Sequence, residues 1–108
     1  MNSIETQYKC LIDTLKKTNY ADYTYNFERI RDAFEYASAS HGEQLRKDGS
    51  PFVSHPLAAA IIVAEMGLDE ESVIAALLHD CIEDTPITYE DIVKRFGTEI
   101  ADIVEGVT

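Results

Sequence analysis

The residues best suited to chemistry lie near the end of one apolar segment, where His79 and Asp80 are followed by Glu83 and Asp84. Imidazole and carboxylate groups bind first-row transition metals, and carboxylates also accept protons from water. Residues four positions apart lie on the same side of a helix, so His79 pairs with Glu83 and Asp80 with Asp84. The four side chains are therefore predicted to form one polar patch.

The position of this patch indicates that a positive charge lies beside it and compensates its carboxylates. Its three carboxylates follow an apolar stretch, residues 73–78, and lie at the end of a helix, where the helix dipole disfavours negative charge. An unpaired charge in a buried segment lowers the stability of the fold by roughly several kcal/mol. A divalent metal held by His79 and Asp80 would offset this cost and would organise Glu83 and Asp84 around a water molecule.

His55 is the third candidate metal ligand. It stands at the start of an apolar helix that ends at Gly67, and Asp69 can cap the helix that follows. So short a link favours antiparallel packing, which would bring His55 close to His79 and Asp80. Mixed imidazole and carboxylate ligands suit Mn, Fe or Zn better than Mg or Ca.

A second candidate site is the basic pair Arg46 and Lys47, nine and eight residues before His55. Such a pair can bind an anion or stack on a base beside a metal, and it can equally be a solvated loop. The acidic pair likewise has the plainer interpretation of a solvated helix end, and His55 that of a cap or loop histidine. The pattern alone leaves these alternatives open.

Helical periodicity runs along the chain and predicts an all-α bundle of about six helices that would position these residues. A loop rich in turn residues is expected over 42–51, and residues 51–53 are the one short segment that could form a strand. Cap and turn signals set the expected helix limits at 3–17, 27–40, 55–66, 70–85, 88–96 and 98–108.

Composition and charge narrow the function classes. The chain has 108 residues, 45% hydrophobic and 27% charged, which suits one soluble globular domain. A net charge of −11 argues against nucleic-acid or membrane binding, but it allows a small anionic ligand at a local positive site. Two distant cysteines, Cys10 and Cys81, predict no disulfide framework and a reducing, cytoplasmic location.

Two segments resemble the N-terminal HD domain of the RelA/SpoT homologue family. They are AFEYASASHGEQLRKDGSPFVSHPLAAA and LLHDCIEDTPITYEDIVKRFGTEIADIVEGVT, and the resemblance runs over about residues 34–108. They carry the basic loop, the His-Pro helix start, the LLHDxxEDT helix and the FG…GVT segment of that family. Other HD phosphohydrolases lack the EDT and GVT elements. The resemblance implies an HD-domain helical bundle, of which residues 1–108 would form the N-terminal part, incomplete at the C-terminus.

The resemblance also implies roles for the residues singled out above. His55, His79 and Asp80 would be three of four protein ligands of Mn²⁺, and the fourth would be an Asp in a later helix, beyond residue 108. Glu83 and Asp84 would handle the hydrolytic water. We therefore expect the 108-residue chain to bind Mn²⁺ weakly and to hydrolyse its substrate slowly or not at all.

Arg46 and Lys47 would, by the same resemblance, contact the guanine end of a nucleotide. The implied reaction is hydrolysis of the 3′-pyrophosphate of ppGpp or pppGpp to GDP or GTP and pyrophosphate, as part of the stringent response. A longer parent protein could carry a synthetase domain and bind ribosomes. Residues 41–44 depart from the family's order, and we assign them no role. The alternatives are a phosphohydrolase of other nucleotides and a non-catalytic regulatory module.

Overall fold

The computed structural model describes residues 3–18, 25–42, 44–45 and 47–106, apart from the side chains of Ser3 and Asp84. An all-α fold is confirmed, because the β contact found in this part of the chain is one isolated bridge between Leu45 and Pro51. None of the described helices combines the length and apolar character needed to cross a bilayer. The helices are α1 (Ser3–Lys17), α2 (Phe27–His41), α3 (Ser54–Glu65), α4 (Glu70–Leu78), α5 (Cys81–Asp84), α6 (Tyr89–Phe96) and α7 (Thr98–Gly106).

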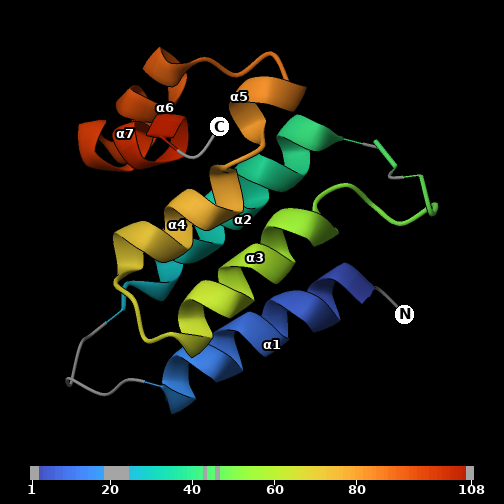
Figure 1. Ribbon diagram of the computed structural model, residues 1–108, viewed down its shortest axis with the longest axis vertical. Helices are drawn as coiled ribbons and strands as arrows, with labels where there is room; N and C mark the ends of the chain where they lie inside the picture. Colours follow the sequence, from blue (N-terminus) through green and yellow to red (C-terminus); the bar gives the residue numbers. More distant parts are fainter. Residues whose placement is uncertain (1–2, 19–24, 43, 46, 107–108) are drawn as a thin grey trace.

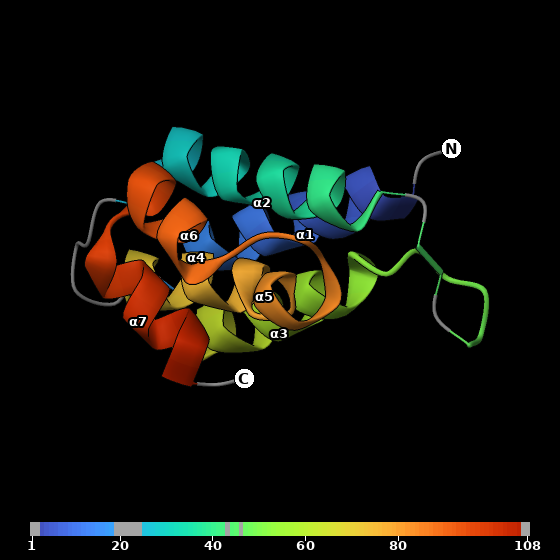
Figure 2. The same ribbon diagram turned by 90° about the horizontal axis from the view of Figure 1, so that it is seen from above.

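The helix α4 lies at the centre of the bundle. It packs against α3, α2 and α7, while α1 packs on α3 and α6 packs on α7 (Figures 1 and 2). Apolar side chains from these helices meet in one core, as their spacing predicts. Its fully buried members include Leu11, Leu15, Ile30, Leu57, Val73, Ile74, Leu77, Leu78, Ile92 and Ile100.

Among the residues that the structure describes, three helices begin with a side-chain cap. Asn26 accepts from the backbone N–H of residue 29 before α2, and Asp69 accepts from Ser72 before α4, as expected for that residue. Thr88 forms a capping box with Asp91 before α6. The first turn of α3 differs, because Val53 at its cap position provides no side-chain hydrogen bond.

The helix expected over residues 70–85 is instead two helices, which brings the number of described helices to seven. His79 and Asp80 lie in the turn between α4 and α5. The His79 Nδ1 atom lies 2.6 Å from the carbonyl oxygen of Ala76, and the His79 backbone N–H bonds to the same oxygen at 3.5 Å. These contacts replace the regular helical bond, and Asp80 follows with ψ of −4°. The four polar residues are therefore not spaced as on one continuous helix.

Candidate metal centre

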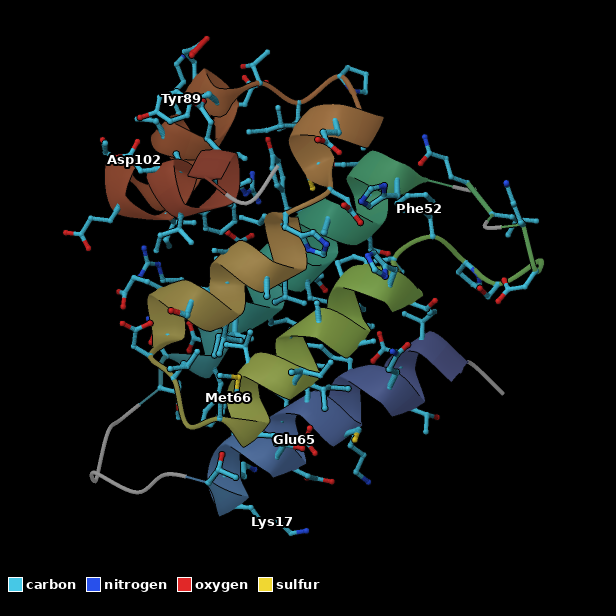
Figure 3. All side chains as sticks on the ribbon, in the orientation of Figure 1. Lys17, Phe52, Glu65, Met66, Tyr89 and Asp102 are labelled. Atoms are coloured by element: carbon cyan, nitrogen blue, oxygen red, sulfur yellow. The ribbon has the colours of Figure 1, made fainter. Side chains whose placement is uncertain are left out.

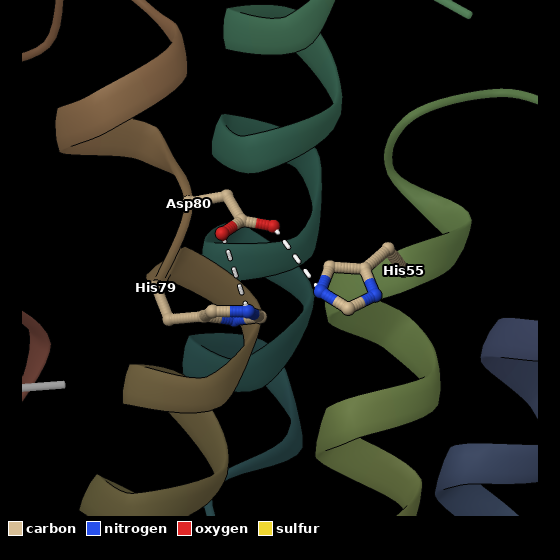
Figure 4. A group of neighbouring side chains, drawn as sticks. All are labelled: His55, His79 and Asp80. Carbon is tan, nitrogen blue, oxygen red and sulfur yellow. Dashed lines mark ion pairs between the residues drawn. The ribbon is translucent and has the colours of Figure 1, made fainter. Parts of the chain in front are cut away.

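His55, His79 and Asp80 converge at one point of the bundle. Each offers one ligand atom, and these atoms all lie within 4.8 Å of one another. The carboxylate of Asp80 lies between the two imidazoles, with Oδ2 at 3.6 Å from His55 Nε2 and Oδ1 at 3.3 Å from His79 Nε2 (Figure 4). The structure thus brings together the three residues proposed as metal ligands.

The link between α3 and α4 explains this convergence. Gly67 adopts a φ of 72° in the tight turn that follows α3, a conformation that favours glycine. The two helices pack side by side in opposite directions, so the first turn of α3 lies beside the end of α4 (Figure 1). His55 is the second residue of α3, and His79 follows the last residue of α4.

The donor set fits a first-row transition metal. With ligand bonds of about 2.1 Å, neighbouring ligand atoms lie roughly 3.0–3.4 Å apart. Oδ1 of Asp80 lies at such a distance from His79, 3.3 Å, and Oδ2 lies slightly farther from His55, at 3.6 Å. Because the Nδ1–H of His79 donates to the Ala76 carbonyl, Nε2 is the nitrogen left to bind a metal, and it lies 3.3 Å from Oδ1 of Asp80. A backbone acceptor at the distal nitrogen is typical of metal-binding histidines.

The three candidate ligands are partly buried. The side chains of His79 and Asp80 are 19% and 15% exposed, and that of His55 is 45% exposed. His79 also lines an apolar groove of about 300 Å³ between α3, α4 and α7, with Ala59, Val63 and Ile103 among its neighbours. Apolar walls strengthen the attraction between a metal and its ligands, because they lower the local dielectric.

A family comparison agrees with this geometry. Residues 33–108 match the model of the HD domain. This chain belongs to the HD domain family. The match includes His55, His79 and Asp80, and it also covers the connection between α2 and α3.

Named relatives narrow the family further. The guanosine-3′,5′-bis(diphosphate) 3′-pyrophosphohydrolase of Aquifex aeolicus (strain VF5) is 54% identical over 86 residues, 80% of this chain. The bifunctional (p)ppGpp synthase/hydrolase SpoT of Escherichia coli (strain K12) is 51% identical over 81 residues, 75% of this chain. The chain spans 12% of the length of either relative. These matches confirm the resemblance to the HD domain of the RelA/SpoT family.

A solved structure has the same fold as this HD domain. It is that of a metazoan orthologue of SpoT, described as hydrolysing ppGpp and playing a role in starvation responses. The two share 33% sequence identity and superpose with a TM-score of 0.73, over 80% of this chain and 51% of the other.

The structure says less about the residues predicted to activate water and to bind the nucleotide. Glu83 is exposed on α5, whereas the side chain of Asp84 and the whole of Arg46 lie outside the described residues. Lys47 is exposed and lines a hollow of about 480 Å³ beside Phe52. This hollow is separate from the groove that His79 lines. The roles of these four residues stay predictions.

His41, to which sequence analysis assigned no role, is the buried histidine of this HD domain. It is 2% exposed at the end of α2, and its ring stacks on that of Phe52 with centroids 4.7 Å apart. Phe52 lies between the end of α2 and the start of α3 (Figure 3). A sequence signal did exist, because position 41 continues a helical apolar stripe. Its earlier members are Ile30, Ala33, Phe34 and Ala37.

Proposed function

We propose that this HD domain binds Mn²⁺ through His55, His79 and Asp80 and hydrolyses the 3′-pyrophosphate of ppGpp or pppGpp. The observation that carries the proposal is the convergence of these three ligand atoms in a chain 54% identical to a relative named for that reaction. The choice of manganese rests on the mixed nitrogen and oxygen ligand set and on the family resemblance.

A bound divalent ion would supply the positive charge and Lewis acidity that a polyphosphate substrate requires. The chain's own residues prepare that site. The bond from His79 to Ala76 fixes the tautomer and orientation of its ring, and Asp80 supplies the negative charge between the two imidazoles.

We assign Glu83 the role of proton acceptor for the attacking water, because it is exposed and follows Asp80 by three residues. The water oxygen joins the phosphorus bonded to the ribose 3′-oxygen, and the bond between that phosphorus and the 3′-oxygen breaks. The ribose oxygen takes up a proton, so the products are GDP or GTP and pyrophosphate. We assign Asp84 the role of partner to Glu83 in this proton transfer.

Arg46 and Lys47 are the proposed contacts to the nucleotide. A chain with net charge −11 needs local cations to recruit an anionic substrate. In steady-state kinetics, we expect Arg46→Ala to raise KM more than it lowers kcat, because the residue acts on binding. A synthetase domain in the same protein and binding to the ribosome stay predictions of the family resemblance.

The test is the release of pyrophosphate from ppGpp by the full gene product with Mn²⁺, compared with Asp80→Asn. We expect turnover by the native protein only, with ATP and GTP as poor substrates. Equal turnover of ATP or GTP would favour the phosphohydrolase of other nucleotides. Metal binding without turnover of any nucleotide would favour a non-catalytic regulatory module.

A further inference from the structure

The first turn of α3 must hold His55 without the cap that α2, α4 and α6 each possess. Val53, at the cap position, provides no side-chain acceptor. The imidazole of His55 is itself half-exposed, and among the described residues its one ion pair is the 3.6 Å contact with Asp80. Besides its contacts with Asp80 and the His79 ring, the direction of the half-exposed His55 ring therefore depends on the backbone of this turn.

Backbone hydrogen bonds connect this turn to the end of α2. The N–H of Gln44 donates to the carbonyl of His41 at 3.1 Å, and the N–H of Phe52 donates to the carbonyl of Gln44 at 2.9 Å. The N–H of His55 then donates to the carbonyl of Phe52 at 3.1 Å. Three consecutive hydrogen bonds thus lead from the last residue of α2 to the candidate metal ligand.

The side chain of His41 holds two of the residues on this path. Its ring stacks on Phe52 with an interplanar angle of 27°, and its Nδ1 lies 3.3 Å from Oε1 of Gln44. In that pair Nδ1 must donate, because a carbonyl oxygen only accepts. His41 therefore contacts both ends of the connection between α2 and α3.

The other ring nitrogen indicates why a histidine occupies this position. Nε2 of His41 is buried and has no hydrogen-bond partner among the described residues. An unpaired buried polar atom costs about 1–3 kcal/mol, and a phenyl ring would stack on Phe52 without that cost. What histidine adds is the Nδ1–H donor toward Gln44.

We propose that His41 is a positioning residue for His55. Its ring fixes Phe52 and its Nδ1–H fixes Gln44, and together these contacts hold the backbone that leads into the first turn of α3. The inference rests on the proposed metal centre. Groups that orient a metal ligand from outside the coordination sphere typically change metal affinity by about 10–100-fold.

Three variants separate the two contacts. His41→Phe keeps an aromatic ring and loses the donor, whereas His41→Asn keeps a donor near the Nδ1 position and loses the ring. His41→Ala loses both. Ile30→Val is the matched control, because it shortens a fully buried side chain of the same helix away from the site.

The first measurement is Mn²⁺ affinity of the full gene product by electron paramagnetic resonance titration. We expect about 10-fold weaker binding for His41→Phe and His41→Asn and about 100-fold weaker binding for His41→Ala. The Ile30→Val control should lower the melting temperature and leave the affinity unchanged. If His41→Ala does not fold, the other two variants carry the test.

The second measurement uses the metal-free protein. The rings of His55 and His79 have centroids 5.2 Å apart, close enough for a cross-peak between their protons in nuclear magnetic resonance spectra. We expect the cross-peak to weaken in the His41 variants and to persist in Ile30→Val. The inference is overturned if the variants keep the native cross-peak and the affinity of the control. An intact cross-peak with no Mn²⁺ binding by the native protein would instead contradict the proposed function.

Discussion

The two arms of the candidate metal centre are held in different ways. His79 and Asp80 lie between the fully buried Leu78 and Cys81, and the His79 ring is bonded to a backbone carbonyl. His55 lies on an uncapped turn, with its ring half-exposed. One arm is thus anchored by the hydrophobic core and the other by a connection between helices. We call His79 and Asp80 the core arm and His55 the loop arm. The core arm should be preorganised without metal, whereas the position of the loop arm should depend on the contacts around His41.

The largest effect is expected at Asp80, the carboxylate of the core arm, because it contacts the imidazoles of both arms. Asp80→Asn replaces the negative charge between the two imidazoles with a neutral amide. We expect Mn²⁺ affinity to fall by more than about 100-fold, beyond the effect of losing an orienting group. The measurement is the stabilisation of the folded chain by Mn²⁺ in thermal unfolding, with circular dichroism to verify the fold. An affinity within threefold of the native value would contradict a ligand role for Asp80.

Removing each imidazole in turn should distinguish the arms. His55→Ala and His79→Ala should both weaken Mn²⁺ binding, because each removes a nitrogen ligand. Only His79→Ala should lower metal-free stability, by about 1 kcal/mol, since it loses the bond to Ala76. That loss corresponds to roughly 4–8 °C in the melting temperature of a chain of this size. Equal losses of stability in the two variants would remove the distinction.

A smaller effect is expected in amide hydrogen exchange. Mn²⁺ should slow exchange in residues 53–57 more than in residues 76–81, because the backbone around His55 should open more often when no metal is bound. The measurement is exchange with and without Mn²⁺ at one pH, with Asp80→Asn as the control that should show no difference. Equal protection of both segments would indicate that the arms are equally preorganised.

The smallest effect is expected at the surface pair between α1 and α2. Two hydrogen bonds from Arg31 hold the pKa of Glu5 below its usual value of 4.5. A lowered carboxyl pKa adds stability above that usual value, and this contribution disappears as the pH falls through the folded pKa. Glu5→Gln should therefore flatten the acid limb of melting temperature against pH. Mn²⁺ affinity at neutral pH should not change, and a change would link the loop arm to this exposed pair.

Local signals in the sequence were sufficient for most of the fold. The caps and Gly67 set the limits of the helices, and the short link after α3 led to the approach of His55 to His79. The break after α4 was not predictable from periodicity, because it depends on a side-chain bond to the Ala76 carbonyl.

Other features that the sequence did not predict are contacts between residues far apart along the chain. The stacking of His41 on Phe52 joins residues on either side of a loop. The bond from Arg29 to the buried Glu70, which joins α2 to α4, spans 41 positions. Such pairs depend on how the helices pack, which one sequence does not specify residue by residue.

The most direct test of the metal centre is anomalous diffraction from crystals of the protein grown with Mn²⁺. We expect one strong peak about 2.0–2.3 Å from Nε2 of His55, Nε2 of His79 and a carboxylate oxygen of Asp80. A peak bound by other residues, or no peak at a concentration of Mn²⁺ that saturates the protein in solution, would contradict the proposed metal centre.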